Sequence, residues 1–296
     1  CSDVPEEYAR LIQLFQHTNQ AFPFEGNRIA VYTEGYTKLQ SLLRELQKAK
    51  QHIHIEYYIF EDDAIGRLVR DVLIEKASQG VEVRVIYDDV GCWHVPNRFF
   101  EEMRNAGIEV RSFLKVRFPL FTSRVNYRNH RKIVVIDGRI GFVGGMNLAE
   151  RYMRGFSWGI WRDTHILIEG KAVHGLQTAF LLDWYFVDRT LITASRYFPK
   201  IESCGSSLVQ VVTSEPIGPW KEIMQGLTMA INGAKKYFYM QTPYFLPTEQ
   251  VLAAMQTAAL AGVDVRLMLP ERADNRITHL GSHSYLADVM QAGVKV

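Results

Sequence analysis

Two stretches of this sequence repeat the same order of strand and helix signals, and this repeat constrains the fold more than any other feature. The first stretch predicts strands at 52–60, 81–89 and 108–113 and helices at 65–80 and 97–107. The second predicts strands at 235–245 and 263–271 and helices at 246–262 and 277–293. Strands that alternate with helices through short glycine-marked joints are typical of α/β folds.

The residues of the two stretches match as well as their order. ASQGVEVRVIYDD (77–89) resembles ALAGVDVRLMLPE (259–271), and NAGIEV (105–110) resembles QAGVKV (291–296). At an offset of about 185 residues, Glu56 falls opposite Gln241. Because chance rarely reproduces both the element order and the joint residues, we infer an internal duplication.

The duplication predicts an α/β chain of two similar α/β/α halves. We place the first half at 1–187, with an N-terminal helix at 5–20 as an appendage, a linker at 188–207, and the second half at 208–296. Val296 is the counterpart of Val110, so we expect the second half to be incomplete in this chain. A second copy of the motif described next would begin roughly twenty residues beyond Val296.

Composition excludes several classes of protein. A hydrophobic content of 47% and a charged content of 22% exclude wholesale disorder, and a net charge of +2 favours no particular partner. No run of 18 apolar residues predicts a membrane-spanning helix, the best candidate at 179–187 being interrupted by Asp183. The three cysteines lie far apart, which excludes a disulfide framework or a zinc site built on them.

Residues 129–147, NHRKIVVIDGRIGFVGGMN, predict a hairpin that carries polar side chains at its open end. Side chains alternate along a strand, so His130 and Lys132 project from one face, and Asp137-Gly138 predicts a two-residue turn. Taken singly, these features are also typical of a solvated strand edge and an ordinary turn.

The returning strand of this hairpin carries three further polar or bare positions, Gly144, Gly145 and Asn147, back beside His130. An imidazole, an ammonium, glycine amides and a carboxamide then meet at one place. These groups supply the nucleophile, the fixed positive charge and the N–H donors that a phosphorus centre requires.

The full string HxKxxxxDGxxxxxGGxN resembles the HKD signature of the phospholipase D superfamily, carried here by His130, Lys132 and Asp137. Longer stretches at 52–63, 161–186, 241–247 and 261–274 are similar to bacterial cardiolipin synthases. The resemblance implies that two HKD motifs meet at one active site. One histidine attacks a phospholipid phosphorus to give a phosphohistidine, and the other protonates the leaving alcohol.

For a cardiolipin synthase, the resemblance further implies phosphatidylglycerol as both donor and acceptor, with release of glycerol. By family analogy we assign the attack to His130. This chain holds one such histidine, so we expect the fragment alone to be inactive unless a homodimer joins two copies of His130. A phospholipase D or nuclease-type phosphodiesterase, and a non-catalytic lipid-binding module, are the alternatives.

Further residues receive roles through the same resemblance. It places an acid that fixes the histidine tautomer some thirty residues after the motif, where Asp163 lies, although a salt bridge with Arg162 is the alternative. We expect Asp137 to hold the turn, and Glu56 and Gln241 to line the floor of a shared site. No metal-ligand cluster lies near the motif, so we expect no metal and no cofactor.

Residues 114–132 interleave basic and aromatic side chains. This composition suits an anionic bilayer, although it could also grip single-stranded nucleic acid or form an ordinary connecting loop. We expect an anionic phospholipid partner at the bacterial cell membrane and no nucleic acid. His94, His165 and His174 fall in no motif.

Overall fold

The structure is a computed structural model that describes residues 6–114, 128–157, 159–215, 218–272 and 276–296. The described chain divides into two compact units, a large unit formed by Pro23–Val211 and a small unit formed by Cys1–Phe22 with Val212–Val296. The basic and aromatic segment predicted at 114–132 lies mostly outside the described residues.

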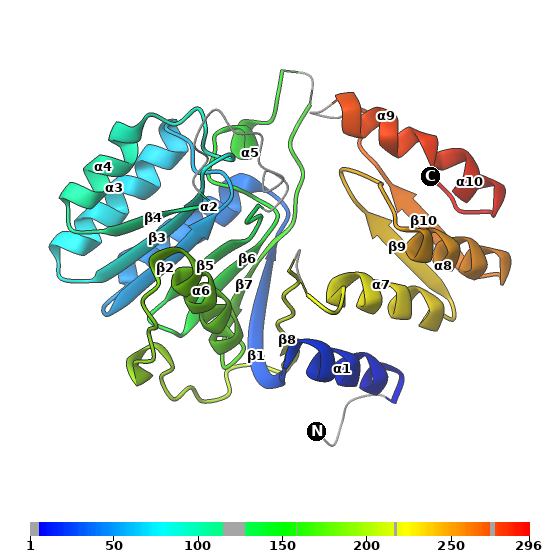
Figure 1. Ribbon diagram of the computed structural model, residues 1–296, viewed down its shortest axis with the longest axis horizontal. Helices are drawn as coiled ribbons and strands as arrows, with labels where there is room; N and C mark the ends of the chain where they lie inside the picture. Colours follow the sequence, from blue (N-terminus) through cyan, green and yellow to red (C-terminus); the bar gives the residue numbers. More distant parts are fainter. Residues whose placement is uncertain (1–5, 115–127, 158, 216–217, 273–275) are drawn as a thin grey trace. The chain divides into compact units, whose positions relative to one another are not determined.

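The large unit is built on a sheet of eight described strands in the order β4-β3-β2-β5-β6-β7-β1-β8, in which β2, β3 and β4 run parallel (Figure 1). Its elements are β1 (Pro23–Tyr32), α2 (Gly35–Lys48), β2 (His52–Tyr57), α3 (Ala64–Ser78), β3 (Glu82–Asp88), α4 (Asn97–Asn105), β4 (Glu109–Phe113), β5 (Lys132–Ile136), β6 (Ile140–Gly144), α5 (Arg151–Arg154), β7 (His165–Glu169), α6 (Val173–Asp188), the 3-10 turn η2 (Ser195–Tyr197) and β8 (Ser207–Gln210).

Helices cover both faces of this sheet. On one face, α2, α3 and α4 bury Leu42, Val69 and Phe99 against strand residues such as Ile55 and Val134. On the other face, α6 packs through a second apolar cluster that includes Ile133, Val135, Val173, Leu176 and Ala179. The result is the three-layer arrangement that the sequence predicts, and the α/β class is confirmed.

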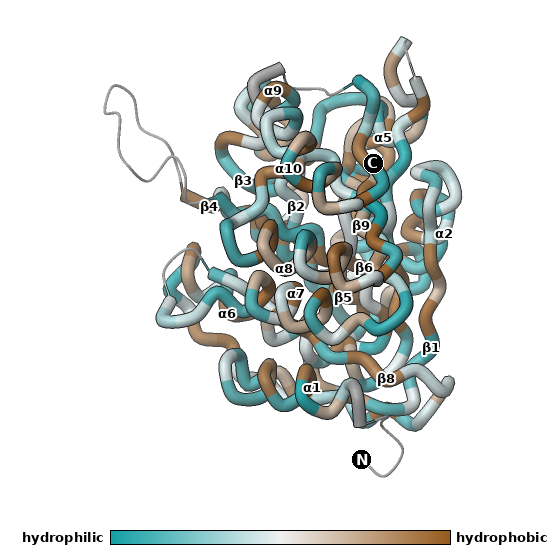
Figure 2. The backbone as a smooth tube through the Cα atoms, turned by 90° about the vertical axis from the view of Figure 1, so that its right-hand side faces the viewer, coloured by the Kyte–Doolittle hydropathy of each residue, from teal (hydrophilic) through white to brown (hydrophobic). Residues whose placement is uncertain are grey.

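The small unit contains a parallel pair of described strands with helices packed against it. Its elements are α1 (Glu6–Asn19), α7 (Glu222–Gly233), β9 (Tyr237–Gln241), α8 (Glu249–Leu260), β10 (Asp264–Met268), α9 (Arg276–Ser284) and α10 (Leu286–Gln291). Hydrophobic and hydrophilic stretches alternate along α1 and α8, as in amphipathic helices (Figure 2). The apolar side of α8 faces a core that includes Met255, Val265, Leu267 and Val289, whereas α1 packs against α7.

The two units share the strand register that the duplication predicts. In the large unit Glu56 of β2 pairs with Ile86 of β3, and in the small unit Gln241 of β9 pairs with Met268 of β10. Both pairs of strands are parallel, and a helix connects the strands in each. The predicted strands and helices of both stretches are therefore confirmed, except that the helix predicted at 277–293 is divided into α9 and α10.

The unit boundaries differ from the predicted domains at the N-terminal helix. This helix groups with the small unit, where Phe15 packs against Gly226 of α7 and Asn19 donates to the Thr213 carbonyl over 3.0 Å. It therefore belongs to the second half rather than to the first.

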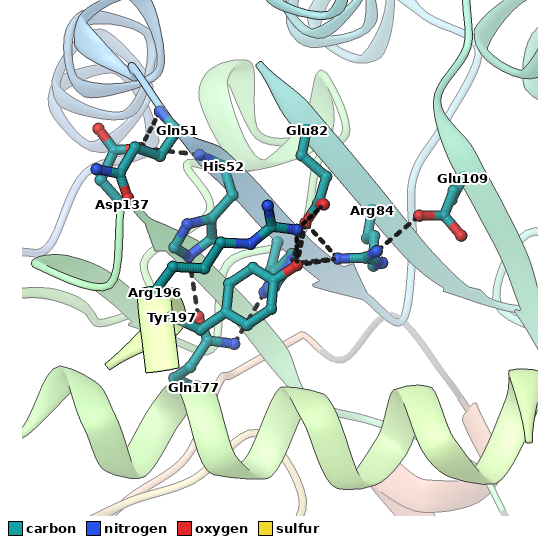
Figure 3. Close-up of polar contacts among 10 residues, drawn as sticks. Gln51, His52, Glu82, Arg84, Glu109, Asp137, Gln177, Arg196 and Tyr197 are labelled. Atoms are coloured by element: carbon teal, nitrogen blue, oxygen red, sulfur yellow. Dashed lines mark hydrogen bonds and ion pairs between the residues drawn. The ribbon is translucent and has the colours of Figure 1, made fainter. Parts of the chain in front are cut away.

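The predicted linker at 188–207 packs against the sheet of the large unit. Tyr197 is buried, with its ring 4.8 Å from that of His52 and 5.0 Å from that of His54. Its hydroxyl accepts from Arg84 over 2.9 Å (Figure 3). These contacts make the segment a part of the large unit.

The hairpin turn between β5 and β6 is held by Asp137. Asp137 and Gly138 both have positive φ values of 52° and 64°, as the predicted two-residue turn requires. The Asp137 carboxylate accepts from the backbone N–H groups of Gln51 and His52 over 2.8 and 2.9 Å (Figure 3). It also accepts from the backbone N–H of Lys50 over 2.9 Å. Asp137 thus ties the hairpin to the start of β2, at the opposite end of β5 from His130.

We expect Asp137→Ala to lower the free energy of unfolding by about 2 kcal/mol, because three backbone donors lose a charged acceptor. Asp137→Asn is the matched control, since it keeps one acceptor oxygen and tolerates positive φ, and should cost less than about 1 kcal/mol. Urea unfolding measures both values. An alanine variant as stable as the parent would show that this contact does not hold the turn.

Candidate active site

His130 and Lys132 lie together at the start of β5. The Lys132 side chain is buried, with 3% of its surface exposed, whereas His130 stays partly open to solvent. The Lys132 Nζ donates to the His130 carbonyl over 2.7 Å and lies 2.9 Å from His130 Nδ1. The ring of Tyr58 packs 4.5 Å from the His130 ring, and the ammonium lies 5.4 Å from the Tyr58 ring centre.

The surroundings of this pair shift both pKa values downward. Burial, together with the charge of Lys132, lowers the pKa of His130 to about 4. Burial lowers the pKa of Lys132 to about 7, against the opposing charges of Asp163 and Asp88. His130 is therefore neutral at pH 7, which is the form that can act as a nucleophile.

The residues on either side of His130 are anchored by polar contacts. The backbone N–H of Asn129 donates to Asp88 over 3.2 Å, and its side-chain oxygen accepts from the N–H of Arg131 over 3.0 Å. The Asn129 amide also donates to Glu56, and Arg131 forms an ion pair with Asp183 of α6. These contacts fix the backbone that carries the histidine.

Glu56 lies on the other face of the sheet from Lys132. In the register of β2 and β5 it pairs with Ile133, and neighbouring strand residues point to opposite faces. Burial, followed by the charge of Asp183, raises the pKa of Glu56 well above its ordinary value. Within the described residues, Glu56 supports the segment of His130 and does not line the face that Lys132 occupies.

Gly144 and Gly145 permit a close approach of β6 to the strand beside it. A Cβ atom at Gly144 would lie 2.5 Å from the Cα of His165, and one at Gly145 would lie 2.0 Å from an oxygen of Asp163. The N–H of Gly145 already donates to the Thr164 carbonyl over 2.9 Å. In this structure the sheet therefore uses the Gly145 amide, and its contact with phosphate, which would require this bond to break, stays a prediction.

Asn147 is buried behind the hairpin and both ends of its carboxamide have partners. Its oxygen accepts from the N–H of Ile59 over 3.0 Å, and its nitrogen donates to the hydroxyl of Tyr152 over 2.6 Å. In this arrangement Asn147 joins α5 to the end of β2. Its predicted contact with phosphate would require one of these bonds to break.

Asp163 lies against Gly145, where its charge opposes the lowering of the Lys132 pKa. It accepts from the N–H of Thr164 over 2.6 Å, and the structure records no hydrogen bond between its carboxylate and His130. The predicted salt bridge with Arg162 is absent from these described residues as well, since Arg162 donates to the Thr164 hydroxyl over 2.7 Å. The tautomer role of Asp163 stays a prediction.

Three buried side chains near Lys132 were not predicted from the sequence, namely Lys38, Tyr57 and His165. Lys38 of α2 donates to the hydroxyl of Tyr57 over 2.9 Å, and burial lowers the pKa of Lys38 to about 7. His165 is wholly buried in β7. No local pattern marks them, because they come from three elements that only the folded sheet brings together.

Gln241, the other residue predicted for the site floor, belongs to the small unit, where it ends β9. In the described part of the chain, no group of three or more His, Cys, Asp or Glu side chains could hold a metal ion. None of the described helices combines the length and the apolar character that crossing a bilayer requires.

Replacing Glu56 with glutamine should change how stability depends on pH. Its pKa is raised in the folded state, so the folded protein keeps this proton where the unfolded chain has lost it. Stability is then lost as pH rises from the ordinary pKa toward the raised one. We expect Glu56→Gln to match the parent near pH 4 and to be more stable at about pH 8, by urea unfolding.

Glu82→Gln is the control, because we expect its effect on stability at about pH 8 to have the opposite sign. Burial raises the pKa of Glu82, but hydrogen bonds with His54 and Tyr197 and the charge of Arg84 lower it to about 2. Its contribution to stability is present above the ordinary pKa and disappears as pH falls toward about 2. Equal losses of stability in both variants at about pH 8 would contradict a raised pKa for Glu56.

Comparisons with known proteins agree with this geometry. The family described as "Cardiolipin synthase, PLD-like domain" matches residues 42–184 and 227–296. The chain is 44% identical over 274 residues to a cardiolipin synthase of Geobacillus kaustophilus, covering 92% of this chain and 55% of that protein. It is 41% identical over 290 residues to the major cardiolipin synthase ClsA of Bacillus subtilis, covering 97% and 60%.

The fold extends to a solved structure of low sequence identity, the phosphatidylserine synthase of Haemophilus influenzae. That likeness has a TM-score of 0.66 at 12% identity and covers 97% of this chain and 73% of that one. The chain spans little more than half the length of the two cardiolipin synthases. Because the family match covers most of both units, the chain belongs to the cardiolipin synthase family of phospholipase D-like proteins.

Proposed function

We propose that this chain carries the nucleophilic half of a cardiolipin synthase, which transfers a phosphatidyl group between two phosphatidylglycerol molecules. The observation that carries the proposal is a neutral His130 in contact with the buried ammonium of Lys132. A neutral imidazole can attack phosphorus, and an ammonium fixed beside it can neutralise the phosphate charge. The names of the relatives supply the substrate class.

The proposed reaction is a double displacement. A ring nitrogen of His130 forms a bond to phosphorus while the bond from phosphorus to the glycerol oxygen breaks, and the leaving oxygen takes up a proton. The hydroxyl of a second phosphatidylglycerol then attacks the phosphohistidine, loses its proton and releases His130. Lys132 stays charged through both steps and holds the phosphate oxygens.

A second histidine must supply the proton to the leaving glycerol in this proposal. His130 is occupied with phosphorus at that moment, so it cannot serve as the acid. A further motif of the same kind or the His130 of a second copy in a homodimer would provide it. The substrates place the reaction at an anionic membrane surface.

The function is tested on an assembly that supplies both His130 and a second histidine, either a protein with a further motif of the same kind or a homodimer of this chain. This assembly is incubated with phosphatidylglycerol vesicles, and the lipids are separated by chromatography. We expect cardiolipin and glycerol as products, and a loss of at least about 10³-fold in His130→Ala. His174→Ala is the matched control, because His174 of α6 bonds to the Pro199 carbonyl, which lies by the turn of the hairpin and at the opposite end of β5 from His130. Formation of phosphatidic acid without cardiolipin would indicate a hydrolase, and unchanged activity in His130→Ala would refute the proposal.

The activity should be confined to a window of pH set by two groups. His130 must be neutral, which requires a pH above its pKa of about 4, and Lys132 must be charged, which requires a pH below its pKa of about 7. We therefore expect kcat/KM to follow a bell between these limits, because kcat/KM reports the free enzyme. A rate that keeps rising with pH beyond about 8 would show that the charge of Lys132 is not needed.

A further inference from the structure

A row of directly paired residues crosses the sheet at the level of Lys132. Tyr57 of β2 pairs with Lys132 of β5, and Gly144 of β6 pairs with His165 of β7. The register of β5 and β6, in which Ile133 pairs with Val143, sets Lys132 opposite Gly144. Residues paired directly across strands point to the same face, so Tyr57, Lys132 and His165 share one face of the sheet.

Gly144 leaves a space between Lys132 and His165, two of the three titratable residues of this row. A Cβ atom at Gly144 would lie 2.6 Å from His165 Nδ1, so the imidazole leans over the glycine. The ring therefore leans toward β5, the strand of Lys132. Any larger residue at position 144 would separate His165 from Lys132.

Both side chains have unused hydrogen-bonding capacity. His165 is wholly buried, and among the described residues neither of its ring nitrogens has a partner. A buried imidazole without a partner is costly, so a nearby donor is expected. An ammonium has three N–H groups, and in the described structure the Lys132 ammonium has partners only on His130, namely its carbonyl and its two ring nitrogens.

We propose that His165 is a positioning residue for Lys132, whose ammonium donates to the His165 imidazole across Gly144 when phosphate binds. The inference rests on the proposed function and deepens it. One N–H of Lys132 stays on the His130 carbonyl and a second is held by His165. The third turns from His130 Nδ1 to a phosphate oxygen, which frees His130 for its attack.

The charges around the row support a neutral His165. Burial, followed by the charges of Lys38 and Lys132, lowers the pKa of His165 well below its ordinary value. A neutral ring keeps an unprotonated nitrogen that can accept. The other titratable groups around Lys132 are His130, Tyr58, Asp88, Asp163, Tyr57 and Lys38.

The test follows the titration of Lys132 by NMR of its side-chain carbon in this chain, saturated with inorganic phosphate. The resonance is assigned by its loss in Lys132→Met. His165→Phe fills a similar volume without a nitrogen, whereas His165→Asn keeps an acceptor near the Nδ1 position. His52→Phe is the matched control, because His52 is also buried in the same sheet but bonds to Gln177 on the α6 face.

We expect His165→Phe to lower the titration midpoint of Lys132 by about one pH unit, because the ammonium loses a hydrogen bond. His165→Asn and His52→Phe should stay within about 0.3 units of the parent. An unchanged midpoint in folded His165→Phe, or an equal shift in His52→Phe, would overturn the proposal. If His165→Phe does not fold, the titration of the His165 ring nitrogens is followed by NMR in the parent. A His165 that stays neutral well below about pH 6.5 supports the proposal, whereas one that titrates near about 6.5 contradicts it.

Catalysis supplies a readout that separates this inference from the proposed function. In the vesicle assay, His165→Phe should lower kcat about tenfold with little change in KM and move the alkaline limb of the pH profile to lower pH by about one unit. An unmoved alkaline limb would contradict the positioning role. If an assembly that supplies both His130 and a second histidine makes no cardiolipin while the NMR shift is found, the proposed function fails and the contact between Lys132 and His165 stands.

Discussion

The burial of one ammonium, that of Lys132, is the constraint on which the rest of this site depends. A lone charge in an apolar interior is strongly unfavourable, so the fold must provide acceptors or let the group lose its proton. In this structure the ammonium has an acceptor, and its pKa is also lowered. The His130 carbonyl accepts from the ammonium over 2.7 Å, and burial still brings its pKa down to about 7. With a pKa of about 7, Lys132 is only partly charged at neutral pH, and a phosphate bound beside it, as we propose, would favour the charged form.

The two faces of the sheet provide different polar contacts around Lys132. On the face of α2, the row of Tyr57, Lys132 and His165 forms a polar strip inside an otherwise apolar layer. On the face of α6, Glu56 and Asp183 hold the residues on either side of His130. Neighbouring strand residues point to opposite faces. The residues beside His130 can therefore be fixed from the α6 face while His130 itself stays open to solvent.

Much of the fold was predictable because its signals are local. The alternation along 132–136 and the Asp137-Gly138 turn predict the hairpin from adjacent residues, and the repeated segments predict the paired strands of both units. The roles of Gly145 and Asn147 were not predictable in the same way. Their partners, Thr164 and Tyr152, are set by the pairing of β6 with β7 and by the position of α5, which no local pattern reports.

Contacts between segments that are distant in the sequence also set the unit boundaries. Residues 188–207 read as a linker, yet Tyr197 finds His52, His54 and Arg84 on strands far away in the sequence. The N-terminal helix packs on α7, more than two hundred residues later. Contacts of this kind depend on the assembled surface, so the sequence predicts that a helix forms but not where it packs.

The central claim is that His130 is the nucleophile toward a phosphodiester. The most direct measurement is mass spectrometry of this chain after exposure to bis(p-nitrophenyl) phosphate, whose nitrophenolate leaves without a proton donor. Formation of a bond from nitrogen to phosphorus with loss of one nitrophenolate predicts a nitrophenyl phosphate adduct on the peptide that contains His130. The adduct should be absent in His130→Asn. An adduct on another residue, or nitrophenolate release that persists in His130→Asn, would contradict the account.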